Sequence, residues 1–139
     1  MTATQSVDAA ARATEDWIDD FVRRLGWRDR DRAYSALIAA LHALRSCLQQ
    51  DEVIYLGAQL PALLRGQYYE GWHPKAHLGA KNRGAFLERV YDNLHRDPGV
   101  DAEVVARTMF ALLAARLPAA EVENAKASTP YELHNLWPS

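Results

Sequence analysis

The chain has 139 residues, of which 49% are hydrophobic and 24% are charged. A chain of this length can bury a sizeable core as one domain, and these proportions exclude an intrinsically disordered protein. The 16 basic and 18 acidic residues give a net charge of -2, so neither nucleic acid nor an anionic membrane is expected as an obligatory partner.

The N-terminal segment predicts an irregular stretch followed by one helix. Residues 1–13 are small and polar, and we expect them to be poorly structured. Thr14 can then cap an amphipathic helix whose apolar side chains recur at helical spacing until Gly26 ends it. The acidic residues at the start of this helix form two i,i+4 pairs, which are typical of a solvated face: Glu15, Asp16, Asp19 and Asp20.

Three more helices are predicted before residue 70. The first of them begins at Asp29 or Asp31 and carries an apolar stripe to Leu48, with so many other apolar positions that we expect it to be central and buried. Asp51 can cap a short helix after it. Pro61 fits the first turn of the next helix, where a missing N–H costs nothing.

The pattern lapses between residues 71 and 83, a connection longer than most in a compact domain. Helical periodicity then resumes at Phe86 and stops before Asp97-Pro98-Gly99. Asp101 can cap a further helix, Pro118 opens another, and the capping box Thr129-Pro130-Tyr131-Glu132 predicts the start of a last one. No strand pattern competes with these helices.

The two halves of the chain correspond when one is shifted by 69 positions. Identical residues then coincide at buried or punctuating positions: Leu44 with Leu113, Glu52 with Glu121, Pro61 with Pro130, and Leu64 with Leu133. A duplicated unit would leave an apolar face exposed unless the second copy covered it. We therefore predict an all-α fold in which two tandem repeats of about four helices each pack into one helical bundle domain. The alternative is a chance agreement between two amphipathic bundles.

The predicted domain covers residues 14–139, with repeat one at 14–70, a connection at 71–83 and repeat two at 84–138. Several pieces of its sequence are distinctive: the leucine-rich helix, Ala58-Gln59-Leu60-Pro61, Leu64-Arg65-Gly66, Tyr69-Glu70-Gly71-Trp72, and the later run AFLERV. On these pieces the chain resembles the bacterial domain-of-unknown-function family 2267, over residues 15–138. The resemblance implies an all-helical bacterial protein and no catalytic residue. Gln49-Gln50 departs from the family pattern at a helix start.

The connection 71–83 is the strongest candidate for a binding site. It holds three cations and no acid, and aromatic residues border it, so it can bind the phosphate of a metabolite or nucleotide. The candidate residues are Trp72, His73, Lys75, His77, Lys81 and Arg83. The alternative interpretation is a solvated surface loop with an aromatic plug at its edge.

The sequence predicts no catalytic, cofactor or metal site. His73 and His77 have the spacing of two ligands on one helix face, but Pro74 interrupts them and no third ligand is near. The one cysteine, Cys47, lies beside the buried stripe with no base aligned to it, so we expect a core cysteine. No phosphate-binding glycine loop, catalytic triad pattern or H-E-x-x-H motif is present.

The function we expect is that of a non-enzymatic helical protein–protein interaction or scaffold module, which binds a protein partner or self-associates. The alternative is a ligand-sensing domain that binds a small-molecule anion at Trp72–Arg83, and nucleic-acid binding ranks below both. The N-terminus lacks a signal-peptide pattern, and no apolar run approaches the roughly 20 residues that cross a bilayer. We therefore expect a cytoplasmic protein without a membrane role.

Overall fold

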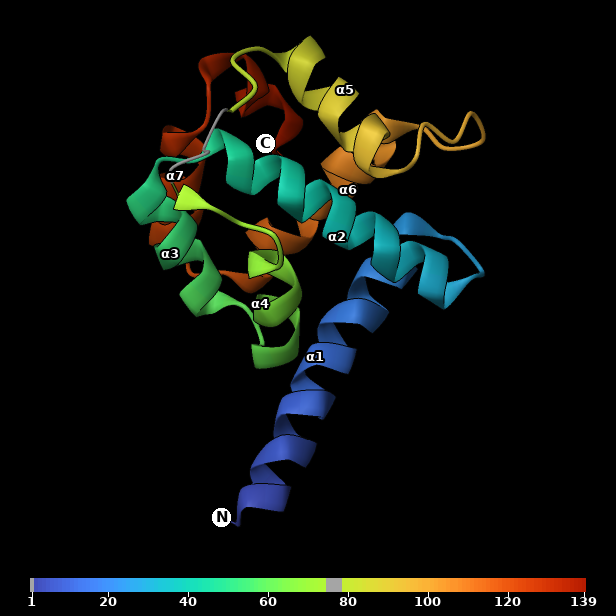
Figure 1. The fold of residues 1–139 in the computed structure, drawn as a ribbon, viewed down its shortest axis with the longest axis vertical. Helices are drawn as coiled ribbons and strands as arrows, with labels where there is room; N and C mark the ends of the chain where they lie inside the picture. The colour runs from blue at the N-terminus through green and yellow to red at the C-terminus, as the bar shows by residue number, and fades with distance from the viewer. Residues whose placement is uncertain (1, 75–78) are drawn as a thin grey trace.

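The computed structural model describes residues 2–74 and 79–139, and all regular structure in these ranges is helical (Figure 1). The elements are α1 (Ala3–Leu25), α2 (Arg30–Cys47), α3 (Gln50–Gln59), α4 (Ala62–Tyr69), α5 (Arg83–Asn93), α6 (Ala102–Arg116), α7 (Ala119–Ser128) and the 3-10 helix η2 (Tyr131–Leu136). The predicted all-α helical bundle is therefore confirmed.

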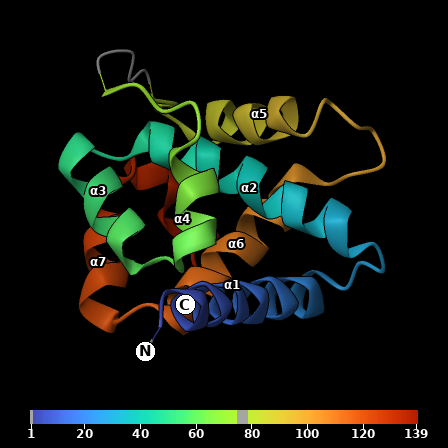
Figure 2. The same ribbon diagram turned by 60° about the horizontal axis from the view of Figure 1, so that its bottom comes forward.

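Helix α2 forms the centre of the bundle, as predicted. It contacts α1, α4, α5 and α6, and Figure 2 shows it running between α5 and α1. Nine of its 18 residues are buried. The fully buried side chains around it come from both halves of the chain, and they include Phe21, Leu41, Leu44, Phe86 and Phe110. One core therefore serves the whole chain.

The two halves interlock. Helix α1 packs on α6, α2 on α5, and α3 on α7, so each half covers apolar surface of the other. Helices α3 and α7 both contain 10 residues, and their bounds differ by the predicted 69 positions. Pro61 and Pro130 precede α4 and η2 with nearly the same backbone angles, φ -56 and ψ 147 against φ -55 and ψ 145. These matches agree with the predicted repeat, whereas the 23-residue α1 and the 11-residue α5 differ in length. The duplication itself stays a prediction.

The prediction that residues 1–13 are poorly structured is wrong for residues 3–13, which form the first half of α1. The Thr2 side chain accepts a hydrogen bond from the Gln5 N–H at 3.2 Å, and the Thr2 N–H donates to Gln5 Oε1 at 2.8 Å. This capping box precedes an alanine-rich run with high helix propensity. Thr14 is no cap, because its hydroxyl is buried and donates to the Ala10 carbonyl. The first turns of α1 project from the body (Figure 1).

One residue of the acidic face of α1, Asp20, differs from the prediction of a solvated face. Asp20 is only 3% exposed, and its carboxylate accepts hydrogen bonds from Arg24 Nε and Arg116 Nε, both at 2.8 Å. Burial raises the pKa of Asp20, but the hydrogen bonds from Arg116 and Arg24 outweigh it and hold that pKa below its usual value. Arg116 also pairs with Asp16 at 2.7 Å. Asp16 and Asp20 therefore tie α1 to α6. Three of the four acidic residues are exposed, as predicted: Glu15, Asp16 and Asp19.

Most of the other predicted helix starts are confirmed, and two more are not. Asp29 and Asp101 cap α2 and α6 with their side chains. The residue before α3 is Gln49, not Asp51. The predicted capping box at residues 129–132 is wrong, because the Thr129 hydroxyl donates to the Lys126 carbonyl at 2.6 Å and so closes α7. The element that follows is a 3-10 helix without a side-chain cap.

Candidate functional site

The aromatic residues at the end of α4 pack as a short cluster. The rings of Tyr68 and Tyr69 lie 5.0 Å apart, and those of Tyr69 and Trp72 lie 5.8 Å apart. The buried Tyr68 hydroxyl donates to the Val53 carbonyl at 2.9 Å, which joins α4 to α3. Gly71 turns the chain with φ +76, a conformation that favours glycine. This is the structural plug that the sequence suggested as the alternative role of these aromatic residues.

The structure separates the described members of the predicted anion site. Trp72 lies against Tyr69, whereas the Arg83 guanidinium donates to Asn135 Oδ1 at 2.8 Å and to Glu103 Oε1 at 2.7 Å. Arg83 thus joins α5 to α6 and η2. His73 and Lys81 are exposed, and Lys75 and His77 lie outside the described residues. Anion binding at this connection stays a prediction.

Lys81 contributes to the lining of an open hollow of about 390 Å³. The hollow lies where α2 and α7 end, and Cys47, Gln49 and Ser128 also contribute to its lining. The C-terminal ends of helices carry negative partial charge, which opposes an anion there. Cys47 is buried, as predicted, and burial raises the pKa of its thiol above the ordinary value. A neutral thiol at pH 7 is a poor nucleophile.

Two buried carboxyl groups meet between α3 and α7, and the sequence did not predict their contact. Glu52 is 7% exposed and Glu121 is 8% exposed, and their carboxyl groups lie in hydrogen-bonding contact. The Oε1 atom of each has no hydrogen-bond partner within the described ranges. Burial and the facing Glu121 carboxyl raise the pKa of Glu52 from 4.5 to about 8. The signal in the sequence was the coincidence of these two residues in the repeat.

Large apolar side chains are exposed on the outer side of α3. Ile54 is 56% exposed and Tyr55 is 62% exposed. The Tyr69 hydroxyl lies 3.4 Å from the Ile54 carbonyl, and a Cβ at Gly57 would overlap that hydroxyl. Tyr69 therefore extends the same surface, and Trp72 continues it. We call Ile54, Tyr55, Tyr69 and Trp72 the α3–α4 surface.

Within residues 2–74 and 79–139, no group of three or more His, Cys, Asp and Glu side chains is arranged to hold a metal ion. None of the helices in the described part of the chain is both long and apolar enough to span a bilayer.

A family model described as "Uncharacterized conserved protein (DUF2267)" matches residues 14–136. The chain belongs to this family. The predicted family resemblance is thus confirmed, and a bacterial origin stays a prediction. A search of the curated proteins finds no match. The part of the chain that matches DUF2267 contains the α3–α4 surface and both buried glutamates, whereas residues 3–13 of α1 lie outside it.

Proposed function

We propose that this DUF2267 protein is a non-enzymatic helical module that binds another protein through the α3–α4 surface. The partner that we propose first is a second copy of the chain. The observation that carries this proposal is a difference between α3 and α7. At the two positions of α7 that correspond to the exposed Ile54 and Tyr55, the chain has Glu123 and Asn124, which are exposed as well.

The comparison of α3 with α7 indicates which residues of α3 the fold requires. Helices α3 and α7 have the same length and pack on each other, and both bury a valine, Val53 in α3 and part of Val122 in α7. Because α7 folds with polar residues on its outer side, the exposed apolar residues of α3 are not required for packing. Tyrosine and tryptophan are enriched in protein interfaces, where they supply large contact areas at little entropic cost.

Self-association tests the proposal directly. Sedimentation of the wild-type chain over a wide concentration range should show a mass that rises with concentration. The double variant Ile54→Glu, Tyr55→Asn gives α3 the outer residues of α7, so it should fold and stay monomeric. The matched control, Glu123→Gln with Asn124→Ser, should associate like the wild type.

A strictly monomeric wild type would exclude the second copy as partner. A photocrosslinking residue at position 55, compared with the same residue at position 124, then tests for another protein. Adducts from position 55 alone would support the α3–α4 surface. Equal labelling from both positions, or none, would contradict it.

The second candidate is the sensing of a phosphorylated metabolite or nucleotide at Trp72–Arg83. The exposed Lys81 beside the hollow at the end of α2 favours it, whereas the contacts of Arg83 and the two helix C-termini do not. Inorganic phosphate and ATP should raise the melting temperature of the wild type and not of Lys81→Gln if this candidate is right. No shift with either anion would rule it out. We also propose a cytoplasmic location, on the composition of the chain alone.

A further inference from the structure

The two buried glutamates occupy the same place in their helices, and neither has the partner that this place usually provides. Each is the third residue of its helix, where a glutamate commonly accepts a hydrogen bond from the N–H of the residue before the helix. Before α3, the Gln49 N–H donates to Ser128 Oγ at 2.9 Å instead. Before α7 stands Pro118, which has no N–H. Both carboxyl groups therefore face each other across the contact between α3 and α7.

Among the described residues, the groups around this pair supply no compensating positive charge. On α3, Asp51 adds a further carboxylate, whose Oδ1 accepts from the Glu52 N–H at 2.9 Å. On α4, the Tyr68 hydroxyl faces the pair and donates to the Val53 carbonyl.

The basic side chains of α2, α4, α6 and α7 are bound elsewhere or make no ion pair with a described residue. Arg65 of α4 donates to the carbonyls of Gly57 and Leu60, both at 2.9 Å. Arg45 of α2 donates to the carbonyls of Tyr68 and Glu70. Arg116 of α6 pairs with the two aspartates of α1. Lys126 of α7 makes no ion pair with a described residue, so neither glutamate has a cationic partner in the described ranges.

Two carboxylates that touch in a buried place cannot both be charged at low cost, because each lacks water and repels the other. One proton on the pair removes the repulsion and supplies a donor for the hydrogen bond between them. The raised pKa of Glu52 agrees with this arrangement.

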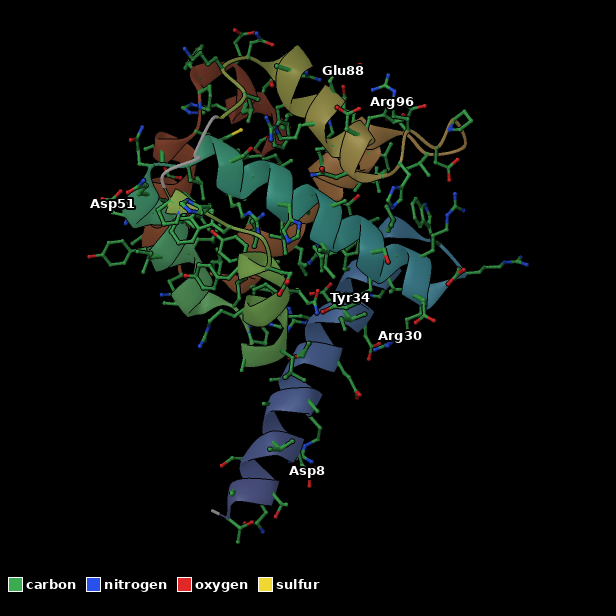
Figure 3. All side chains as sticks on the ribbon, in the orientation of Figure 1. Asp8, Arg30, Tyr34, Asp51, Glu88 and Arg96 are labelled. Carbon is green, nitrogen blue, oxygen red and sulfur yellow. The ribbon has the colours of Figure 1, made fainter. Side chains whose placement is uncertain are left out.

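We propose that Glu52 and Glu121 form a proton-linked joint, in which one shared proton holds α3 against α7 and its loss loosens the two helices. The proton comes from solvent and returns to it, and no other bond changes. An open hollow of about 410 Å³, lined by Gln49, Asp51, Glu52 and Tyr55, provides access to water beside the joint. Figure 3 shows Asp51 at the outer edge of this region.

The direction of the pH effect follows from the different proton affinities of the folded and unfolded chains. The folded chain binds the proton more tightly than the unfolded chain does, so the stabilisation is complete below the unfolded pKa of 4.5 and is lost as the pH rises through about 8. Because α3 also carries Ile54 and Tyr55, alkaline pH should loosen the proposed interaction surface. The joint itself does not depend on the proposed function, since it can be measured in a chain that binds nothing.

The test is a carbon-13 NMR titration of the glutamate side-chain carboxyl signals in the full chain. We expect one carboxyl signal of the wild type to titrate with a midpoint of about 8. The melting temperature should fall between about pH 5 and about pH 8, with about one proton released per molecule on unfolding, and should level off above that range. Glu52→Gln and Glu121→Gln should each remove the titration near pH 8 and make the melting temperature nearly independent of pH in this range. Glu123→Gln, on the exposed side of α7, should change neither.

Two results would overturn the joint. The first is a wild-type titration in which every glutamate has an ordinary midpoint, and this measurement stands even if the glutamine variants fail to fold. The second is a melting temperature at alkaline pH that Mg²⁺ or Ca²⁺ restores and a chelator lowers, which would mean that the pair binds a cation in place of a proton. Failure of self-association with an intact titration near pH 8 would reject only the proposed function.

Discussion

The segment after α3 and the segment after α7 correspond in the chain, but polar and aromatic contacts contribute to them in different proportions. Helix α4 is fixed by polar contacts from α2: Arg45 Nη1 donates to the carbonyls of Tyr68 and Glu70, both at 2.6 Å, and His42 Nε2 bonds to the Gln67 carbonyl at 2.7 Å. The 3-10 helix η2 ends instead in the buried Trp137, whose ring lies 4.5 Å from that of Phe110.

The comparison shows that charged hydrogen bonds contribute more at the end of α4, and that aromatic burial contributes more at the end of η2. Where α2 supplies charged donors to free helix carbonyls, the side chain at the corresponding end can stay partly exposed, as Tyr69 does. At η2, Arg107 Nη1 donates to the Asn135 carbonyl at 3.0 Å, and the burial of Trp137 against Phe110 adds an aromatic contact. At the first end Tyr69 stays partly exposed, whereas at the second end Trp137 is buried and Tyr131, at the start of η2, is exposed.

The largest expected effect is at the apolar end. Trp137→Ala removes a ring that is 4% exposed and packs on Phe110, so it should lower the free energy of unfolding by about 3–5 kcal/mol. Urea denaturation measures this change. Trp137→Phe, which keeps a ring, should lose clearly less. Similar losses in both variants would mean that ring burial is not what holds η2.

The next effect is at the polar end. Arg45→Met keeps much of the apolar stem but removes two charged hydrogen bonds to the end of α4, which should cost about 1.5–3 kcal/mol. Hydrogen exchange should show that the backbone amides of α4 lose more protection than those of the other helices. Arg45→Lys should recover part of the stability, whereas an unchanged α4 in the methionine variant would show that packing alone holds this end.

A smaller effect is expected for Tyr68→Phe. The ring stays buried, but the Val53 carbonyl loses its hydroxyl donor, which should cost about 1 kcal/mol. Tyr69→Phe serves as the control, because the Tyr69 hydroxyl reaches the Val53 and Ile54 carbonyls only at 3.5 and 3.4 Å. An equal loss in both variants would contradict the role assigned to the Tyr68 hydroxyl.

The smallest expected effect is a loss of stability at acid pH that comes from His42, which bonds to the end of α4. Burial lowers the pKa of His42 below 6.5 and outweighs the hydrogen bond to the Gln67 carbonyl, so the unfolded chain binds the proton more tightly. Stability should therefore fall slightly as the pH drops through 6.5. His42→Gln should weaken this acid dependence, and His95→Gln, at an exposed position, should not. Thermal melts at a series of pH values measure the difference.

Local interactions are the part of the fold that the sequence predicted well. Asp29, Asp101 and Pro61 mark helix starts because a cap acts within a few residues of itself. The start of α1 was missed although its signal is equally local, a threonine three residues before Gln5 and an alanine run. These alanines carry no amphipathic stripe of their own, so the apolar periodicity that predicts the later helices gives no signal here.

Contacts between distant segments explain the rest. Arg116 and Asp20 are 96 positions apart, and Arg83 reaches Glu103 and Asn135 on two other elements. No spacing rule connects such residues, so the sequence showed Arg83 only as a cation in a loop. Glu52 and Glu121 lie together only because α3 packs on α7. The repeat indicated that the two helices correspond, but it did not show which of their faces are in contact.

The projecting start of α1 has a mechanical consequence. Residues 3–13 continue the same helix that is anchored in the core, so they form a rigid lever of about 16 Å, and Figure 3 shows Asp8 on its side. A probe attached to Thr2 would point in a fixed direction from the body. Each residue inserted into the lever would turn that probe by about 100° and move it outward by about 1.5 Å.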